Sequence, residues 1–188
     1  MVTEERRTGR DPVVSGIMVM SVFGTVWALV GVGGLVASVP LRVVGWVVAP
    51  ALAALVVRTA LRWHAHPDPA RIRPRPQRSG DPGRTFLLVN VAQAVLIPLA
   101  VVGLTRLGRP EYIAPAVCLV VGLHFLPLAR AFAVPLYRTT GLALVAIAVL
   151  GAVLAALGVE IAAVFALVGL CAALTLWATA LQLARTVV

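Results

Sequence analysis

Long apolar stretches without a charged residue dominate this chain. They cover residues 12–41, 85–105, 112–129, 139–159 and 161–184. An apolar segment of about 18 residues or more is long enough to cross a bilayer as a helix. The pattern therefore predicts an all-α integral membrane protein rather than a soluble domain.

A sixth span is expected between Arg42 and Arg58. The uncharged stretch there, Val43 to Val57, would cover about 22 Å as a helix, which is shorter than a hydrocarbon core of about 30 Å. Both arginines must therefore extend their side chains toward the interface. The six predicted spans are 13–39, 41–63, 85–107, 111–131, 139–158 and 159–185.

Composition agrees with this prediction, and the charges add an orientation. Only 12% of the 188 residues are charged, about half the share in an ordinary soluble domain, and 61% are apolar. All sixteen basic residues are arginines, and in the predicted topology all but Arg42, Arg106 and Arg109 lie on one side of the membrane. Because positively charged flanks stay in the cytoplasm, both termini are predicted to be cytoplasmic.

The connections predict one membrane domain, residues 1–188, with a cytoplasmic tail at 1–12 and one long loop at 63–84. The loop carries five prolines and five arginines, a composition that favours extended segments over a packed core. The other connections are short, so we expect a bundle of three antiparallel hairpins.

Anionic lipid headgroups are the expected partners of four loop residues, Arg71, Arg73, Arg75 and Arg78. Since the membrane flanks account for the net charge of +9, no nucleic-acid partner is expected.

Three polar side chains fall inside the predicted third and fourth spans. His124 is the one acidic or basic side chain well inside a span, Asn90 is the only asparagine, and Gln93 follows Asn90 by one helical turn. Asn90 and His124 lie at similar depths, about 8 and 9 Å from the cytoplasmic ends of their helices. One interpretation is a hydrogen bond from Asn90 or Gln93 to His124 that locks the two helices together. The other is a polar pocket, or a proton or cation relay, open to the cytoplasm.

Two prolines add hydrogen-bond acceptors to this region. A proline has no amide hydrogen, so Pro98 leaves the carbonyl of Ala94 without its intrahelical donor, and Pro127 does the same for Leu123. Two freed carbonyls are therefore expected beside the polar cluster.

A second charged group is expected at the outer ends of the helices. It consists of Arg42, Arg106, Arg109, Glu111 and Glu160. These residues could neutralise one another or form a rim that attracts anions. Exposed pairs of this kind contribute under about 1 kcal/mol, and mutual neutralisation is the favoured interpretation.

Motifs that would indicate catalysis or a cofactor are missing. The chain has no intramembrane carboxylate pair, no H-E-x-x-H, no G-x-S-x-G and no phosphate-binding loop. His64, His66 and Asp68 have the spacing of metal ligands, but this motif stands alone in a proline-rich segment. One intramembrane histidine cannot supply both axial ligands of a membrane haem. We therefore expect no metal and no cofactor, and we favour a binding or transport protein over an enzyme.

Residues 121–132, VGLHFLPLARAF, place Gly122, His124, Phe125 and Pro127 in a G-x-H-aromatic-x-P pattern. This segment resembles one on the fourth span of small uncharacterised bacterial membrane proteins of the domain-of-unknown-function kind. The resemblance covers about a fifteenth of the chain and implies no activity.

The absence of lysine beside abundant Ala, Val, Gly, Pro and Arg is typical of a GC-rich bacterial genome. The bacterial plasma membrane is therefore the expected location.

Three classes of function remain open. The favoured one is a multi-pass plasma-membrane protein that acts as a scaffold or regulatory partner of other membrane proteins, or as a homo-oligomer. The second is a small transporter or channel with a polar pocket at His124, Asn90 and Gln93, and the third is an intramembrane enzyme. Transport requires a hydrated path from the outer rim to His124, an enzyme requires a closed pocket near it, and a partner protein requires an exposed seam.

Overall fold

The computed structural model describes residues 12–35, 39–65 and 82–186. They form six α-helices and one 3-10 turn: α1 (Pro12–Leu35), α2 (Val39–Ala65), α3 (Pro82–Arg106), η2 (Pro110–Tyr112), α4 (Ile113–Ala131), α5 (Pro135–Ala156) and α6 (Ile161–Thr186). These residues contain no strand, and each of the six helices is long and apolar enough to cross a membrane. The prediction of an all-α protein with six candidate spans is therefore confirmed for the described residues.

Several helix boundaries differ from the predicted spans. α1 ends at Leu35 rather than at residue 39, and α5 begins at Pro135 rather than at residue 139. Proline suits the first turn of a helix because its missing amide hydrogen removes no intrahelical bond there. α2 continues to Ala65 and α3 starts at Pro82, so both helices enter the ends of the predicted loop 63–84.

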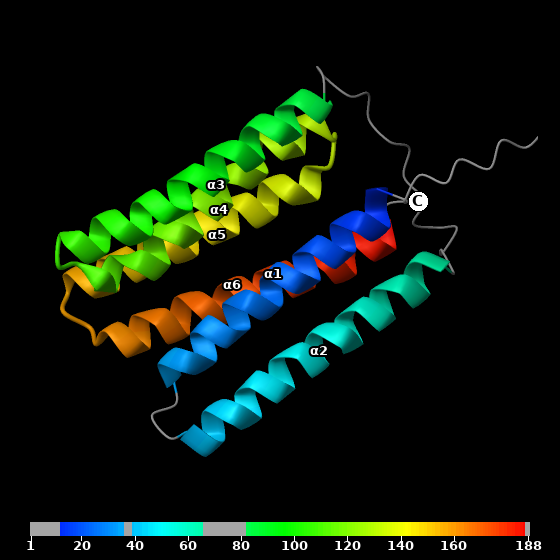
Figure 1. The fold of residues 1–188 in the computed structure, drawn as a ribbon. Coiled ribbons are helices and arrows are strands. Elements are labelled where there is room, and N and C mark those ends of the chain that lie inside the picture. The colour runs from blue at the N-terminus through cyan, green and yellow to red at the C-terminus, as the bar shows by residue number, and fades with distance from the viewer. Residues whose placement is uncertain (1–11, 36–38, 66–81, 187–188) are drawn as a thin grey trace, which may run out of the picture.

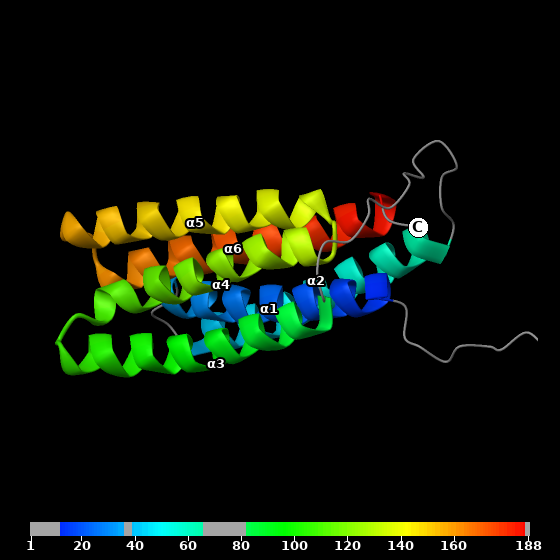
Figure 2. The same cartoon turned by 90° about the horizontal axis from the view of Figure 1, so that it is seen from above.

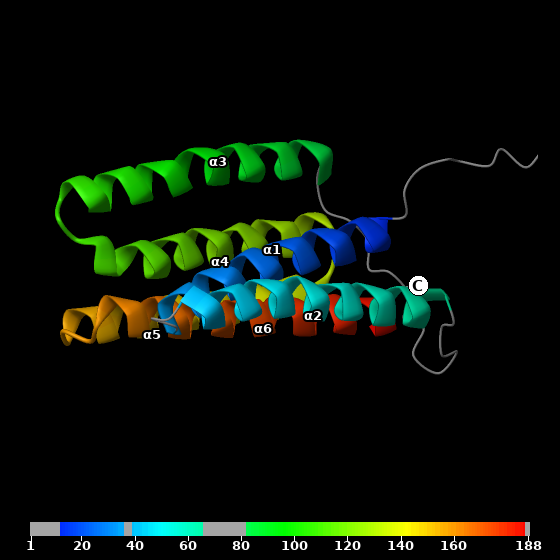
Figure 3. The same ribbon diagram turned by 60° about the horizontal axis from the view of Figure 1, so that its bottom comes forward.

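The six helices run side by side, with α1 and α6 in the middle of the molecule (Figure 1). α6 contacts α1, α2, α4 and α5, and the most extensive packing joins α1 to α6 and α4 to α5. α2 lies on one flank against α1 and α6, whereas α3 lies on the other flank along α4 (Figures 2 and 3). The two helices of each predicted hairpin also touch, but α1 packs more extensively on α6 than on α2, and α4 packs more extensively on α5 than on α3.

Three turns end their helices in the same way. Gly108, Ala133 and Gly158 follow α3, α4 and α5 with φ angles of 68°, 53° and 78°. In each turn the amide of the next residue bonds a carbonyl five residues back, which is the Schellman arrangement. Glycine adopts this left-handed conformation without steric cost, whereas Ala133 adopts it with a side chain present.

Small residues let α1 and α6 pack backbone against backbone. A Cβ atom added to Gly169 would lie 2.5 Å from the amide nitrogen of Gly31 and 2.7 Å from the carbonyl oxygen of Trp27. A Cβ atom added to Gly34 would overlap the carbonyl oxygen of Ala162. Such close approach is a principal way in which helices associate in lipid, so this seam holds the centre of the bundle together.

Candidate functional site

The structure separates Asn90 from the other two residues of the predicted polar cluster. Asn90 Nδ2 donates a hydrogen bond of 2.7 Å to the carbonyl oxygen of Phe86, one turn earlier in α3. Asparagine side chains often bond the backbone of their own segment in this way. Asn90 therefore does not supply the predicted link between α3 and α4.

Gln93 and His124, by contrast, line one groove between α3 and α4. The groove has a volume of about 290 Å³ and is lined by five residues of α3 and four of α4. Apart from Gln93 and His124, all of these residues are apolar. The pairing of Gln93 with His124 across two helices follows the prediction, although their side chains do not bond in the predicted way.

Both polar side chains present a buried atom without a partner. Gln93 Oε1 and His124 Nδ1 are buried and make no hydrogen bond. The backbone of Val89 on α3 lies close to the His124 ring. Gln93 Oε1 is an acceptor, and leaving a buried polar atom without a partner costs about 1–3 kcal/mol.

One of the two prolines expected near the polar cluster lines this groove. Pro127 and Leu123, the residue whose carbonyl it leaves without an intrahelical donor, both belong to its α4 wall. Pro98 and Ala94 are exposed and do not line the groove.

The groove opens at the side of the helix bundle. Leu88, Leu96 and Leu123 at its edge are 58%, 49% and 49% exposed. No described residue in the span of α3, residues 83–106, is buried. In a membrane this surface faces either lipid chains or another helix.

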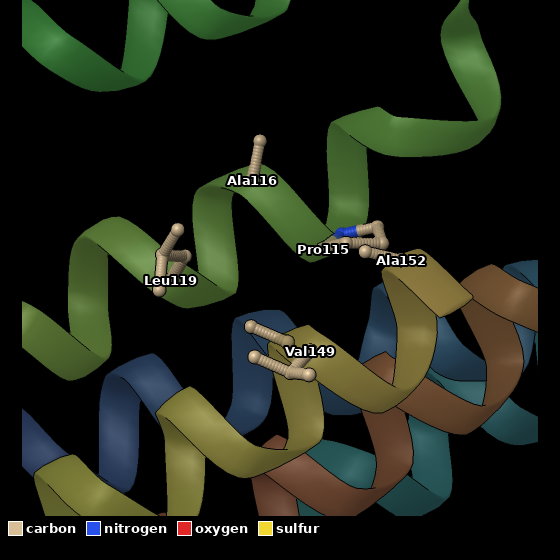
Figure 4. Close-up of a pocket in the computed structure, with 6 residues that line it drawn as sticks. Pro115, Ala116, Leu119, Val149 and Ala152 are labelled. Atoms are coloured by element: carbon tan, nitrogen blue, oxygen red, sulfur yellow. The ribbon is translucent and has the colours of Figure 1, made fainter. Parts of the chain in front are cut away.

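A second groove lies between α4 and α5 (Figure 4). It has a volume of about 210 Å³ and an entirely apolar lining, in which Ala116 and Leu119 of α4 lie opposite Val149 and Ala152 of α5. Along α4, the lining residues of the two grooves form adjacent pairs that recur every four positions, 115/116, 119/120 and 123/124, followed by Pro127. This spacing places them on one face of the helix, over a length of about 16 Å. We call this face of α4, with its two grooves, the α4 trough.

The predicted outer rim is only partly assembled among the described side chains. Arg109 Nη1 lies 3.6 Å from Glu111 Oε1, and the two side chains are 65% and 24% exposed. Arg106 and Glu160 are exposed at the ends of their helices, and the side chain of Arg42 lies outside the described residues. The rim thus contains one exposed ion pair, of the kind that contributes little to stability.

Other predicted residues lie outside the described part of the chain. They are the loop arginines Arg71, Arg73, Arg75 and Arg78, together with His66, Asp68 and the side chain of His64. In the part that is described, no three His, Cys, Asp or Glu side chains are grouped as metal ligands would be.

Sequence reasoning missed a buried pair of hydroxyl groups between α5 and α6. Thr140 Oγ1 and Thr179 Oγ1 lie 2.8 Å apart, and the two residues are 3% and 4% exposed. Each hydroxyl also lies within hydrogen-bond distance of a carbonyl oxygen of its own helix, but because each has one proton, the hydroxyl that donates across the contact cannot also donate to its own carbonyl. A signal was present, because Thr140 continues the buried α5 stripe that contains Ala148 and Gly151. The pair joins two helices and has no connection to the α4 trough.

The four residues of the G-x-H-aromatic-x-P pattern divide between two surfaces. His124 and Pro127 line the groove toward α3, whereas Phe125 is buried and Gly122 packs against the backbone of α5 near Val145. No family model, no curated protein and no solved structure matches this chain. The resemblance to small bacterial six-span proteins therefore stays a prediction, and the function has to be argued from the α4 trough itself.

Proposed function

We propose that this chain is a multi-pass protein of the bacterial plasma membrane that binds a transmembrane helix of another membrane protein along the α4 trough. Its role is that of a scaffold or regulatory partner. The observation that carries this proposal is the groove between α3 and α4, which opens sideways at exposed leucines and is lined by the polar residues Gln93 and His124 among apolar ones. In a membrane such an opening is covered by lipid chains or by another helix, and a helix can pack closely against it.

The dimensions of the trough also suit a helix. Its length of about 16 Å corresponds to three helical turns and to about half of the hydrocarbon core. Its lining is apolar except for Gln93 and His124. Helices in lipid associate by close van der Waals packing and by a few interhelical hydrogen bonds, and the trough offers both.

The proposal includes three antiparallel hairpins with both termini in the cytoplasm. The argument is the distribution of arginines, thirteen of which belong to the side where α1 begins and α6 ends. A reporter fused after Arg185 or inserted near Ser79 should be cytoplasmic, and one inserted at Gly108 should be external. An external signal from the C-terminal fusion would contradict this orientation.

A matched pair of variants on α3 tests the docking proposal. Ala92 and Ala94 are both exposed, but only Ala92 lines the groove. Ala92→Trp should fill the groove and exclude a partner, whereas Ala94→Trp should leave the groove open. The readout is photo-crosslinking in native membranes from a photoreactive residue at position 123, with the captured protein identified by mass spectrometry.

We expect one membrane protein to be captured by the parent and by Ala94→Trp, and to be lost with Ala92→Trp. Equal capture by both tryptophan variants would show that the trough is not the binding surface. Capture of lipid alone in all three proteins would also contradict the proposal.

A transporter is the second candidate, because Gln93 and His124 are the type of polar residues that line solute paths in membranes. Histidine ordinarily titrates near pH 6.5, so a proton path through His124 should be pH-dependent. Flux of protons and small solutes into liposomes is measured from pH 5 to 8 for the wild type and His124→Gln. A pH-dependent flux that is lost in the variant would favour transport over docking.

The third class, an intramembrane enzyme, is less well supported because the groove is open at its edge.

A further inference from the structure

We infer that an anionic phospholipid occupies the groove between α3 and α4 when no partner helix is bound, with its phosphate at Arg84 and Arg130 and an acyl chain in the groove. The lipid site itself is independent of the proposed docking function, whereas its role as a competitor of the partner helix rests on that function. The inference follows from two arginines at one end of a groove that opens sideways.

Both walls of the groove continue into an arginine. Arg84 precedes Leu88 of the α3 wall by four residues, and Arg130 follows Pro127 of the α4 wall by three. Residues at these spacings are neighbours on one face of a helix, so each arginine lies just beyond the end of its wall. Both arginines are exposed.

A ring contact brings these two helix ends together. Phe86 and Phe132, each two residues after one of the arginines, pack edge to face with their ring centroids 6.2 Å apart. The start of α3 and the end of α4 therefore lie side by side at one end of the bundle (Figure 1). A phosphate group over this end is within reach of both long arginine side chains.

The charges of the described residues favour an anion at this end. Glu111 and Glu160 are the acidic residues of the described part of the chain, and both lie at the opposite ends of the helices. Guanidinium groups bind phosphate through paired hydrogen bonds, and basic pockets between helices on the cytoplasmic side are typical sites for anionic headgroups. A zwitterionic headgroup would bring a positive charge to the arginines as well, so an anionic lipid is the better complement.

The groove also has the depth and the polarity that suit an acyl chain. Its α4 wall runs from Pro127 to Val120, about 5 to 15 Å from Arg130 along the helix. One leaflet supplies about half of a hydrocarbon core of about 30 Å, so a chain whose headgroup lies at Arg130 covers this whole length. The lining is apolar except for Gln93 and His124, and the exposed leucines at its edge leave it open to lipid.

A lipid in this position regulates docking by competition. It fills the same groove as the partner helix, so the partner binds only by displacing it. The apparent affinity for the partner therefore falls as the share of anionic lipid in the membrane rises.

The test uses the purified full-length protein in phosphatidylcholine liposomes. They contain a small amount of phosphatidylglycerol or of phosphatidylcholine with a photoreactive group on the acyl chain, and the cross-linked residues are mapped by mass spectrometry. We expect labelling of the groove lining, within residues 88–96 and 120–127. Phosphatidylglycerol should label it at least about 5-fold more than phosphatidylcholine, the preference expected from one arginine near the membrane surface.

Variants identify the groups responsible. Arg130→Gln and Arg84→Gln should each lower labelling by phosphatidylglycerol about 5-fold, and Arg130→Lys should retain most of it because the charge is kept. Arg138→Gln is the matched control, because Arg138 is exposed on α5, which contributes no residue to this groove. Ala92→Trp should abolish labelling in the groove, whereas Ala94→Trp should preserve it.

Two results would overturn the inference. Equal labelling of the groove by the two lipids would show that it does not recognise an anionic headgroup. Equal losses with Arg130→Gln and Arg138→Gln would show that lipid is attracted by the general charge of the surface rather than by a site.

Capture in native membranes separates the lipid site from the docking function. With the photoreactive residue at position 123, Arg130→Gln should raise the yield of the captured protein up to about 5-fold, because a competing lipid is weakened. An unchanged yield would overturn the competition. Labelling by phosphatidylglycerol as expected, with no protein captured, would leave the lipid site standing and overturn docking. A protein that is captured by the parent and lost with Ala92→Trp, without any preference for phosphatidylglycerol, would leave only the docking function.

Discussion

The α1–α6 seam and the α3–α4 seam are two helix contacts of the same chain that are built differently. Between α1 and α6, Gly31 and Gly169 bring the backbones so close that no Cβ atom fits. Between α3 and α4, the helices leave room for a groove of about 290 Å³, and Gln93 and His124 in its lining each have a buried polar atom without a partner. The first seam is closed along its length, whereas the second leaves an open groove.

This difference shows what holds helices together in a bilayer. Lipid chains are as apolar as leucine, so there is no hydrophobic gain when two leucine-rich surfaces meet. Close contact between small residues supplies the attraction at the α1–α6 seam. α3 has no buried residue in its span, and its packing along α4 leaves two buried polar atoms without a partner. A seam of the second kind is suited to exchange one neighbour for another.

The largest effect is expected at the closed seam. Gly169→Ala should lower the free energy of unfolding by about 1–3 kcal/mol, because the added methyl group would meet the backbone of Gly31. Gly33→Ala is the control on α1, since a Cβ atom there meets nothing within 4 Å. It should be neutral or stabilise the helix by up to about 1 kcal/mol. Equal losses for both variants in detergent unfolding would contradict the close contact.

A smaller effect is expected at the other buried contact, between α5 and α6. Thr179→Val keeps the shape of the side chain but removes the hydroxyl that lies 2.8 Å from Thr140 Oγ1. The expected loss is about 0.6–1.7 kcal/mol, the range for interhelical hydrogen bonds in membranes. A double-mutant cycle with Thr140→Val measures the contribution of the pair, and fully additive losses would show that the hydroxyl groups do not interact.

The open seam should respond in the opposite direction. Gln93→Leu removes a buried acceptor without a partner, so the isolated protein should gain up to about 1 kcal/mol of stability. A clear loss of stability in detergent would show that Gln93 makes a hydrogen bond within the chain and that the contact between α3 and α4 is already satisfied.

The smallest effect is expected for the coupling energy between Asn90 and His124. Because Asn90 bonds Phe86 on its own helix, Asn90→Leu and His124→Leu should change stability independently. Their double-mutant coupling should stay below about 0.5 kcal/mol in detergent unfolding. A larger coupling energy would indicate the direct hydrogen bond between Asn90 and His124 that the sequence predicted.

The six candidate spans and most of the polar site could be predicted from the amino-acid sequence. Whether a segment can cross a bilayer depends on its own length and polarity, so it can be read locally, as the stretch 85–105 illustrates. Gln93 and His124 could also be identified from the sequence alone. Polar side chains are rare inside apolar spans because their burial in hydrocarbon is unfavourable, so the few that occur stand out. Position along α4 was enough to place His124 and Pro127 near each other.

The choice of neighbouring helices, and the atoms that remain without partners, depend on how the helices pack. The contact between Gly31 and Gly169 depends on the rotation of two helices that are far apart in the chain, and no local pattern contains that angle. Asn90 does not join α3 to α4 because its amide donates to the carbonyl oxygen of Phe86 on its own helix. The sequence offered both this carbonyl and His124 as acceptors, and the packing of the helices decides between them. The opening of the groove at Gln93 likewise depends on where α3 lies on α4, because burial is a property of the packed helices together and not of either sequence segment alone.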